Sequence, residues 1–152
     1  MTEKQKEFLL ADISARLPYG VKCAEIYPDG NKFENVWDII RVSKYVEDGI
    51  HISNCKTIYG YCSQIQNIKP YLFPITTLTD EQLEEFYCNF VENEISFNDF
   101  KKYYSETTSY FELLTKVSDC PYVVDWFNKN HLDYRGLIPM GLDIDATGKN
   151  IY

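Results

Sequence analysis

The chain has 152 residues and a formal net charge of −8, with 45% hydrophobic and 25% charged residues. Its 13 Tyr, 9 Phe and 2 Trp argue against a disordered chain, because they supply material for a packed core. No segment approaches the ~18 apolar residues of a membrane-spanning helix, and the scattered basic residues argue against binding to nucleic-acid phosphates. The chain begins with a charged stretch and no apolar signal sequence, so we expect a cytoplasmic protein.

Residues 2–17 are predicted to form a helix. Thr2 and Gln5 have the spacing of a capping box, in which each side chain accepts a hydrogen bond from the backbone N–H of the other residue. Apolar side chains recur every four residues from Leu9 to Leu17, which places them on one face. Proline and glycine follow directly and end the helix.

A series of short strands is predicted next, over residues 21–68. The segments are rich in β-branched and aromatic residues, and turn residues at 28–31 favour a hairpin. Strands are predicted at 21–27, 33–46, 50–53, 56–62 and 63–68. Short consecutive strands of this kind favour a small antiparallel sheet or a partly open barrel.

The chain after this sheet is predicted to be mainly helical. Residues 69–78 are predicted to be a connector, because Pro70 and Pro74 exclude a helix there. Thr79 and Gln82 form a second capping-box pattern, and apolar residues follow at the spacing of one helix face. Helices are predicted at 79–95, at 97–105 with Ser96 as the cap, and at 120–131. Residues 109–118 are predicted to be either helical or extended, and the tail irregular.

Together these elements predict an α+β fold, in which the sheet packs with the N-terminal helix and three to four C-terminal helices. The connector separates two parts of different secondary structure. We expect one domain over residues 1–152, with a β-rich half at 18–75 and a helical half at 76–152.

Acidic residues are concentrated in one part of the chain. Residues 79–106 contain eight Asp and Glu against two Lys, a net of −6, whereas residues 1–78 have a net charge of 0. A local negative field repels nucleic-acid backbones and favours basic partners. This charge forms either a solvated helix surface or a surface that docks on a basic groove.

The residues suited to catalysis form no complete motif. A nucleophilic cysteine needs a base that keeps it as a thiolate, and the chain contains only His51 and His131. His51 is expected on a strand and His131 at a helix end. All five cysteines are expected to be reduced, inert thiols in the core, although a role for them stays open. They are Cys23, Cys55, Cys62, Cys88 and Cys120.

No metal or cofactor is expected from the spacing of the polar residues. The cysteines and histidines lack the paired spacing of a zinc site. Asp143 and Asp145 alternate with apolar residues, so they either share a hard cation or face water from a short edge strand. The glycine-rich nucleotide-binding motifs and the serine-hydrolase motif are absent from the sequence.

Three stretches carry a family resemblance: ARLPYGVKC at 15–23, IKPYLFPITTLTDEQ at 68–82 and DWFNKNHLDYRGLIPMGLDIDA at 125–146. They resemble an uncharacterised family of small proteins encoded by phages and mobile elements of anaerobic gut bacteria. The resemblance spans nearly the whole chain apart from residues 92–120, and the family has no established activity. It implies an accessory protein of a phage or integrated element, and it assigns no functional residues. Such a protein is expected in the cytoplasm of the bacterial host.

We expect a non-enzymatic acidic accessory protein that binds another protein. A more specific hypothesis is that it inhibits a nucleic-acid-binding defence machine of the host by occupying a basic channel. The alternatives are a self-assembling structural component of a phage or mobile element, and a small enzyme with a Cys/His or carboxylate site. Contact with nucleic acid or membrane is not expected, and a homo-oligomer stays open. The residues expected to contact the partner are Glu81, Glu84, Glu85, Glu92, Glu94, Asp99, Tyr87, Tyr103, Tyr104 and Tyr110.

Overall fold

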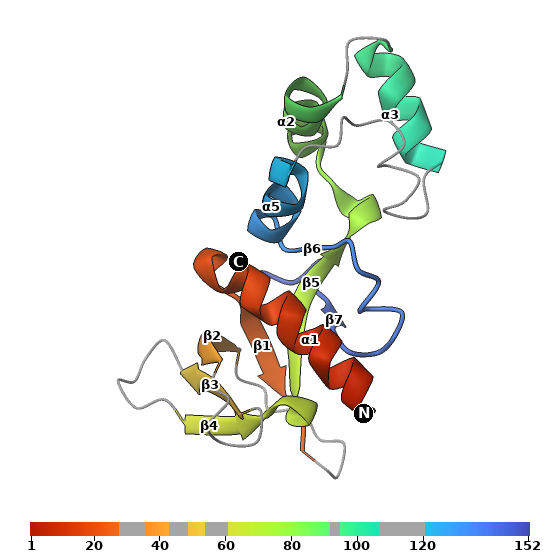
Figure 1. Cartoon of the computed structure of the whole chain (residues 1–152). Helices are drawn as coiled ribbons and strands as arrows, with labels where there is room; N and C mark the ends of the chain where they lie inside the picture. Colours follow the sequence, from red (N-terminus) through yellow and green to blue (C-terminus); the bar gives the residue numbers. More distant parts are fainter. Residues whose placement is uncertain (28–35, 43–48, 54–60, 92–94, 107–120) are drawn as a thin grey trace. The chain divides into compact units, whose positions relative to one another are not determined.

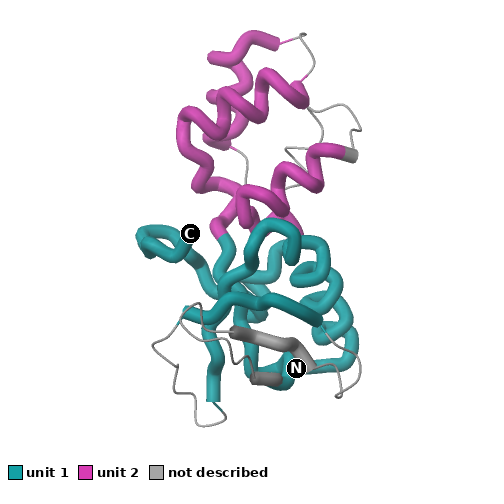
Figure 2. Tube along the Cα trace, turned by 90° about the vertical axis from the view of Figure 1, so that its left-hand side faces the viewer, with its two compact units in different colours: residues 1–72, 136–152 teal, residues 73–135 magenta. Residues whose placement is uncertain are grey.

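The computed structural model describes residues 1–27, 36–42, 49–53, 61–91, 95–106 and 121–152. It shows an α+β protein, which confirms the predicted fold class (Figure 1). The chain divides into two compact units (Figure 2). Unit 1 contains Met1–Leu72 and Gly136–Tyr152, and unit 2 contains Phe73–Arg135. The end of the chain therefore belongs to the same unit as its beginning.

Helix α1 (Glu3–Arg16) of unit 1 begins at the predicted capping box. Thr2 Oγ1 accepts a hydrogen bond from Gln5 N at 3.2 Å, and Gln5 Oε1 accepts one from Thr2 N at 2.8 Å. Leu9 and Ile13 lie on the buried face of the helix. The helix predicted at 2–17 is thus confirmed.

A charged pair is buried within α1. Arg16 Nε donates a hydrogen bond to Asp12 Oδ2 at 2.8 Å, and Arg16 Nη2 donates one to Asp12 Oδ1 at 3.0 Å. Both side chains are 0% exposed. Two parallel bonds between planar groups offset part of the free-energy cost of removing both charges from water. The pair therefore depends on both partners being present.

The sheet of unit 1 has the strand order β4-β3-β2-β1-β5, with antiparallel neighbours. The short strand β7 (Ile144–Asp145) pairs in parallel with β5, so the sheet is mixed rather than purely antiparallel. Along the described strands it is open and does not close into a barrel. Its strands are β1 (Lys22–Glu25), β2 (Trp37–Val42), β3 (Gly49–Ser53), β4 (Tyr61–Gln64) and β5 (Ile68–Pro74), of which β5 continues into unit 2.

One hydrophobic cluster joins α1 to this sheet. It combines the buried face of the helix with side chains from β1 and β2 and from the start of β5. These apolar contacts supply most of the stabilisation of such a layered arrangement. The cluster contains Leu9, Ile13, Val21, Cys23, Trp37, Ile39, Ile65 and Ile68.

The prediction of a connector at 69–78 is wrong, because residues 68–74 form the strand β5. Ile68, Pro70 and Leu72 are buried and alternate with half-buried residues, which is the pattern of a strand with one face in the core. The fixed φ of proline is compatible with extended backbone and removes only one N–H group. The prolines therefore exclude a helix here without excluding a strand.

Short 3-10 helices connect several of these elements. They are η1 (Leu17–Tyr19), η2 (Ile65–Asn67) and η3 (Ile75–Thr77). The strand predicted at 63–68 is wrong, because η2 interrupts the extended chain between β4 and β5. The hairpin turn predicted at 28–31 lies outside the described residues.

Unit 2 contains α2 (Asp80–Phe90), α3 (Phe97–Glu106) and α5 (Pro121–Lys129). The short strand β6 (Leu132–Asp133) pairs in parallel with the last two residues of β5. The predicted helix starts are confirmed, and α2 ends five residues earlier than the predicted 95. The segment 109–118 lies outside the described residues.

The starts of α2 and α3 are fixed by side-chain caps. Thr79 and Gln82 form the predicted capping box of α2, with backbone-to-side-chain distances of 3.0 and 3.2 Å. Ser96 Oγ accepts a hydrogen bond from Asp99 N at 3.2 Å at the start of α3. A cap of this kind typically contributes about 1 kcal/mol to helix stability.

Aromatic rings form the core of unit 2. Phe86 of α2 is 0% exposed and lies at the centre of this cluster. Offset and tilted ring pairs add to the hydrophobic gain from burying the rings. The ring-centroid distances from Phe86 are 5.1 Å to Trp126, 5.2 Å to Phe90, 5.5 Å to Phe127 and 6.2 Å to Phe100.

Helix α5 ends at Lys129, so the prediction that it continues to His131 is wrong. His131 has a φ of 53° in the left-handed region, which a continuing helix does not allow. Its backbone N donates to Asn128 O at 3.1 Å, and its side chain is buried. His131 therefore lies in the turn after the helix rather than in its last turn.

The last residue is bonded into the sheet of unit 1. The Tyr152 hydroxyl accepts a hydrogen bond from Lys22 N at 3.2 Å and donates one to Tyr71 O at 2.8 Å. It thereby links β1 to β5. Within the described ranges, no helix is long and apolar enough to cross a bilayer.

Candidate protein-binding surface

The exposed side of α2 is acidic. Glu81, Glu84 and Glu85 occupy positions i, i+3 and i+4 of the helix, so they share one face, and all three side chains are exposed. The opposite face contributes Leu83 and Phe86 to the core. We call Glu81, Glu84 and Glu85 the acidic face. None of the three forms an ion pair with another described residue.

Two neighbouring carboxylates have local partners. Lys101 Nζ of α3 lies 2.7 Å from Asp80 Oδ1, and both side chains are largely exposed, so the pair contributes little stability. Ser96 Oγ donates a hydrogen bond to Asp99 Oδ2 at 2.6 Å. The Asp99 carboxylate therefore takes part in capping α3 and is a weaker candidate for contact with a partner.

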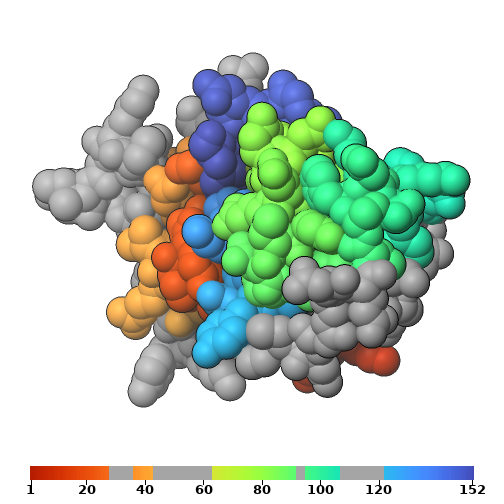
Figure 3. All heavy atoms as spheres, turned by 90° about the horizontal axis from the view of Figure 1, so that it is seen from above, coloured from red at the N-terminus to blue at the C-terminus, as the bar shows by residue number. Residues whose placement is uncertain are grey.

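Figure 3 shows α2 and α3, in green shades, at the surface of unit 2. Unit 2 contains 12 acidic and 5 basic residues, a net of −7, whereas unit 1 contains 11 acidic and 10 basic residues, a net of −1. Nearly all the net charge thus belongs to the unit that carries the acidic face. A field of this strength attracts cationic surfaces over about one Debye length.

Tyr104 is not part of this surface, which corrects its predicted role as a contact residue. Its side chain is buried, and its hydroxyl donates to Ile75 O at 2.7 Å and accepts from Leu78 N at 3.0 Å. Burial raises the pKa of the Tyr104 hydroxyl. The residue thus holds α3 against the segment before α2.

Two of the other predicted tyrosines are half-buried. Tyr103 is half-buried on α3. Tyr87 is also half-buried, and its hydroxyl donates to Ile95 O at 2.6 Å, so it links the end of α2 to the start of α3. Tyr110, together with Glu92 and Glu94, lies outside the described residues.

The surroundings of Cys23 disfavour a role as a nucleophile. Its thiol is buried in unit 1, and burial, followed by the negative charges of Glu25 and Asp38, raises its pKa well above the usual range. The thiol is therefore protonated at neutral pH and unreactive. Cys88 is exposed on α2, so the prediction that it is a core thiol is wrong. The structure does not describe Cys55 and Cys120. It describes only the backbone of His51 and Cys62.

We expect Cys88 to be alkylated rapidly at neutral pH in the native protein, and Cys23 only after unfolding. The reason is that the Cys88 thiol is exposed, whereas the Cys23 thiol is buried and protonated. Iodoacetamide labelling followed by peptide mass spectrometry measures each site, and the Cys88→Ser variant is the control. If Cys23 of the native protein were labelled as fast as Cys88, the burial of the Cys23 thiol would be contradicted.

Asp143 and Asp145 do not both face water as the edge-strand prediction required. Asp143 is 5% exposed, whereas Asp145 is exposed at the end of β7. A hydrogen bond from the Thr147 side chain is the main cause that lowers the pKa of Asp145. Among the described residues, no group of three or more His, Cys, Asp or Glu side chains is placed to hold a metal ion.

No protein-family model, curated protein or solved structure matches the chain. The acidic face is therefore interpreted from its own geometry and charge.

Proposed function

We propose that this protein binds another protein through the acidic face of α2, and that the partner presents a basic surface. The observation that carries the proposal is the set of three exposed carboxylates, Glu81, Glu84 and Glu85, without ion-pair partners among the described residues. They stand on a helix whose opposite side is fixed in an aromatic core. Their spacing is therefore preorganised, which lowers the entropic cost of binding.

Electrostatic repulsion within the acidic face supports a basic partner. Glu81 lies three residues before Glu84 and four before Glu85, and like charges at these spacings destabilise a helix by about 0.2–0.5 kcal/mol per pair. A cationic partner replaces this repulsion with attraction. The same argument disfavours self-association through this face, because two copies would bring like charges together.

In a more specific form of the proposal, the basic surface of the partner is one that normally binds nucleic acid. Protein surfaces that bind nucleic acid are rich in Lys and Arg and attract polyanions. A protein whose negative charge is concentrated in one unit is suited to compete with nucleic acid for such a surface. The resemblance to phage and mobile-element proteins agrees with a non-enzymatic inhibitor of a host nucleic-acid-binding machine.

Charge reversal on the acidic face is expected to weaken binding strongly. We expect Glu84→Lys/Glu85→Lys to weaken capture of the basic partner by about tenfold or more at low salt, because attraction becomes repulsion. Quantitative pull-down from bacterial lysate measures this loss. Since both side chains are exposed, circular dichroism should show unchanged helix content.

A matched control separates the acidic face from net charge alone. Glu7→Lys on α1 of unit 1 makes the same change in charge as the single variant Glu84→Lys, and Glu7 is also exposed. We expect Glu7→Lys to keep most of the partner capture. Equal losses in Glu7→Lys and Glu84→Lys would contradict a specific role of the acidic face.

A further inference from the structure

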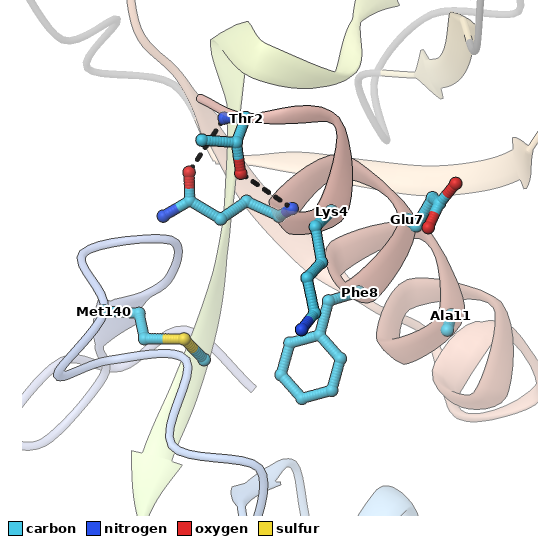
Figure 4. A pocket seen from close by; sticks show the side chains of 7 residues that line it. Thr2, Lys4, Glu7, Phe8, Ala11 and Met140 are labelled. Carbon is cyan, nitrogen blue, oxygen red and sulfur yellow. Dashed lines mark hydrogen bonds between the residues drawn. The ribbon is translucent and has the colours of Figure 1, made fainter.

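A pocket lies on the outer side of α1, within unit 1 and independent of the acidic face. Its volume is about 560 Å³, which is in the range of pockets that hold small organic ligands. It lies between the first three turns of the helix and the loop that contains Met140 (Figure 4). The lining residues are Thr2, Lys4, Gln5, Glu7, Phe8, Ala11 and Met140.

The surface of this pocket is mainly apolar. Phe8 is 37% exposed and Met140 is 43% exposed, although both are large hydrophobic side chains. Ala11 follows Phe8 by three residues, so a small side chain leaves space beside the ring along the helix. Covering Phe8 and Met140 with an apolar group would be favourable by roughly 25 cal/mol for each Å² of apolar surface removed from water.

One cation lies at this apolar surface. Figure 4 shows the Lys4 side chain extending toward the Phe8 ring, whereas the Glu7 carboxylate points away from Met140 and from that ring. Lys4 forms no ion pair with another described residue, whereas Lys6 on the same helix pairs with Glu3 at 2.8 Å. The first turn of α1 adds the partial positive charge of a helix N-terminus. Of the two charged residues that line the pocket, Lys4 is therefore the one whose side chain lies beside the Phe8 ring.

We propose that this pocket binds a small amphipathic molecule that has an apolar chain and one carboxylate. The apolar chain covers Phe8, Ala11 and Met140, and the carboxylate pairs with Lys4 Nζ. A ligand of this class satisfies both properties of the pocket, since an uncharged chain leaves Lys4 without a partner and a cationic one is repelled by it. The site is separate from the proposed protein-binding function and does not depend on it.

Titration with decanoate, below its micellar concentration, tests the proposal on the full chain. We expect saturable binding to the wild-type protein by calorimetry, and about threefold weaker binding of decanol and decylamine, which share the chain but lack the carboxylate, because Lys4 is exposed and an exposed ion pair is weak. No saturable binding of decanoate would overturn the proposal. Equal affinity for decanoate and decylamine would overturn it as well.

Two variants locate the site. Lys4→Met keeps most of the length of the side chain and removes its charge, so we expect about threefold weaker binding of decanoate with little change for decanol. Ala11→Trp fills the pocket and should remove binding of both. Lys6→Met is the matched control on the same helix and should bind decanoate like the wild-type protein. Unchanged decanoate affinity in both Lys4→Met and Ala11→Trp would overturn the proposal, and circular dichroism checks that each variant is folded.

Discussion

Replacing Asp12 by alanine is expected to destabilise the protein by about 3–5 kcal/mol, because the change removes the carboxylate that accepts two hydrogen bonds from the buried Arg16 guanidinium. Such a loss is a large fraction of the stability of a protein of this size. Urea unfolding followed by circular dichroism measures the change.

An exposed ion pair on the same helix provides the control. Glu3 and Lys6 form an ion pair at 2.8 Å, and the Glu3 side chain is 79% exposed. Glu3→Ala should therefore cost less than about 1 kcal/mol. A similarly small cost for Asp12→Ala would contradict the burial of the Asp12–Arg16 pair.

Replacing Phe86 by alanine is expected to destabilise unit 2 by about 3–5 kcal/mol. The ring is 0% exposed and contacts rings from α2, α3 and α5, so its removal leaves a cavity lined by aromatic groups. Trp126 lies 5.1 Å from Phe86 between ring centroids, and its fluorescence should report the loosened core during urea unfolding.

Tyr122 on α5 is the control for this core substitution. Its side chain is 70% exposed, so Tyr122→Ala should change the free energy of unfolding by no more than about 0.5 kcal/mol. If Phe86→Ala had an effect as small as Tyr122→Ala, the aromatic core would not be the main source of stability in unit 2. The acidic face would then lack the rigid support that the proposed function requires.

Local signals in the sequence predicted the helix starts. Thr2, Thr79 and Ser96 each bond a backbone N–H three residues later, so both partners of the cap lie within one turn. Because such a cap needs no distant residue, its pattern is visible in the sequence. The helix ends were less accurate, since His131 lies beyond the end of α5 in a conformation that depends on its surroundings.

Contacts between distant residues were not predictable in the same way. Pro70 lies in β5 because residues about 47 positions earlier, around Cys23 in β1, pair with it. Asp12 and Arg16 have the i, i+4 spacing of an ion pair, but the sequence does not show that the pair is buried. The position of Met140 beside α1 likewise results from the tertiary fold.

The candidate surface was predictable only in part. The apolar stripe of α2 implied that Glu81, Glu84 and Glu85 lie on the outer side, and the structure places them there. Tyr104 was assigned wrongly because tyrosine suits both interfaces and cores. Its spacing of four residues from Phe100 on the apolar side of α3 was the signal for burial.

Capture of partners from bacterial lysate at two salt concentrations tests the central claim most directly. The immobilised protein should retain one specific protein with a basic surface at about 0.1 M salt and release it at about 1 M, where the Debye length falls from about 10 Å to about 3 Å. Mass spectrometry identifies the captured protein, and Glu84→Lys/Glu85→Lys should fail to retain it. Retention that is equal at both salt concentrations and in both proteins, or capture of the protein itself alone, would contradict binding through the acidic face.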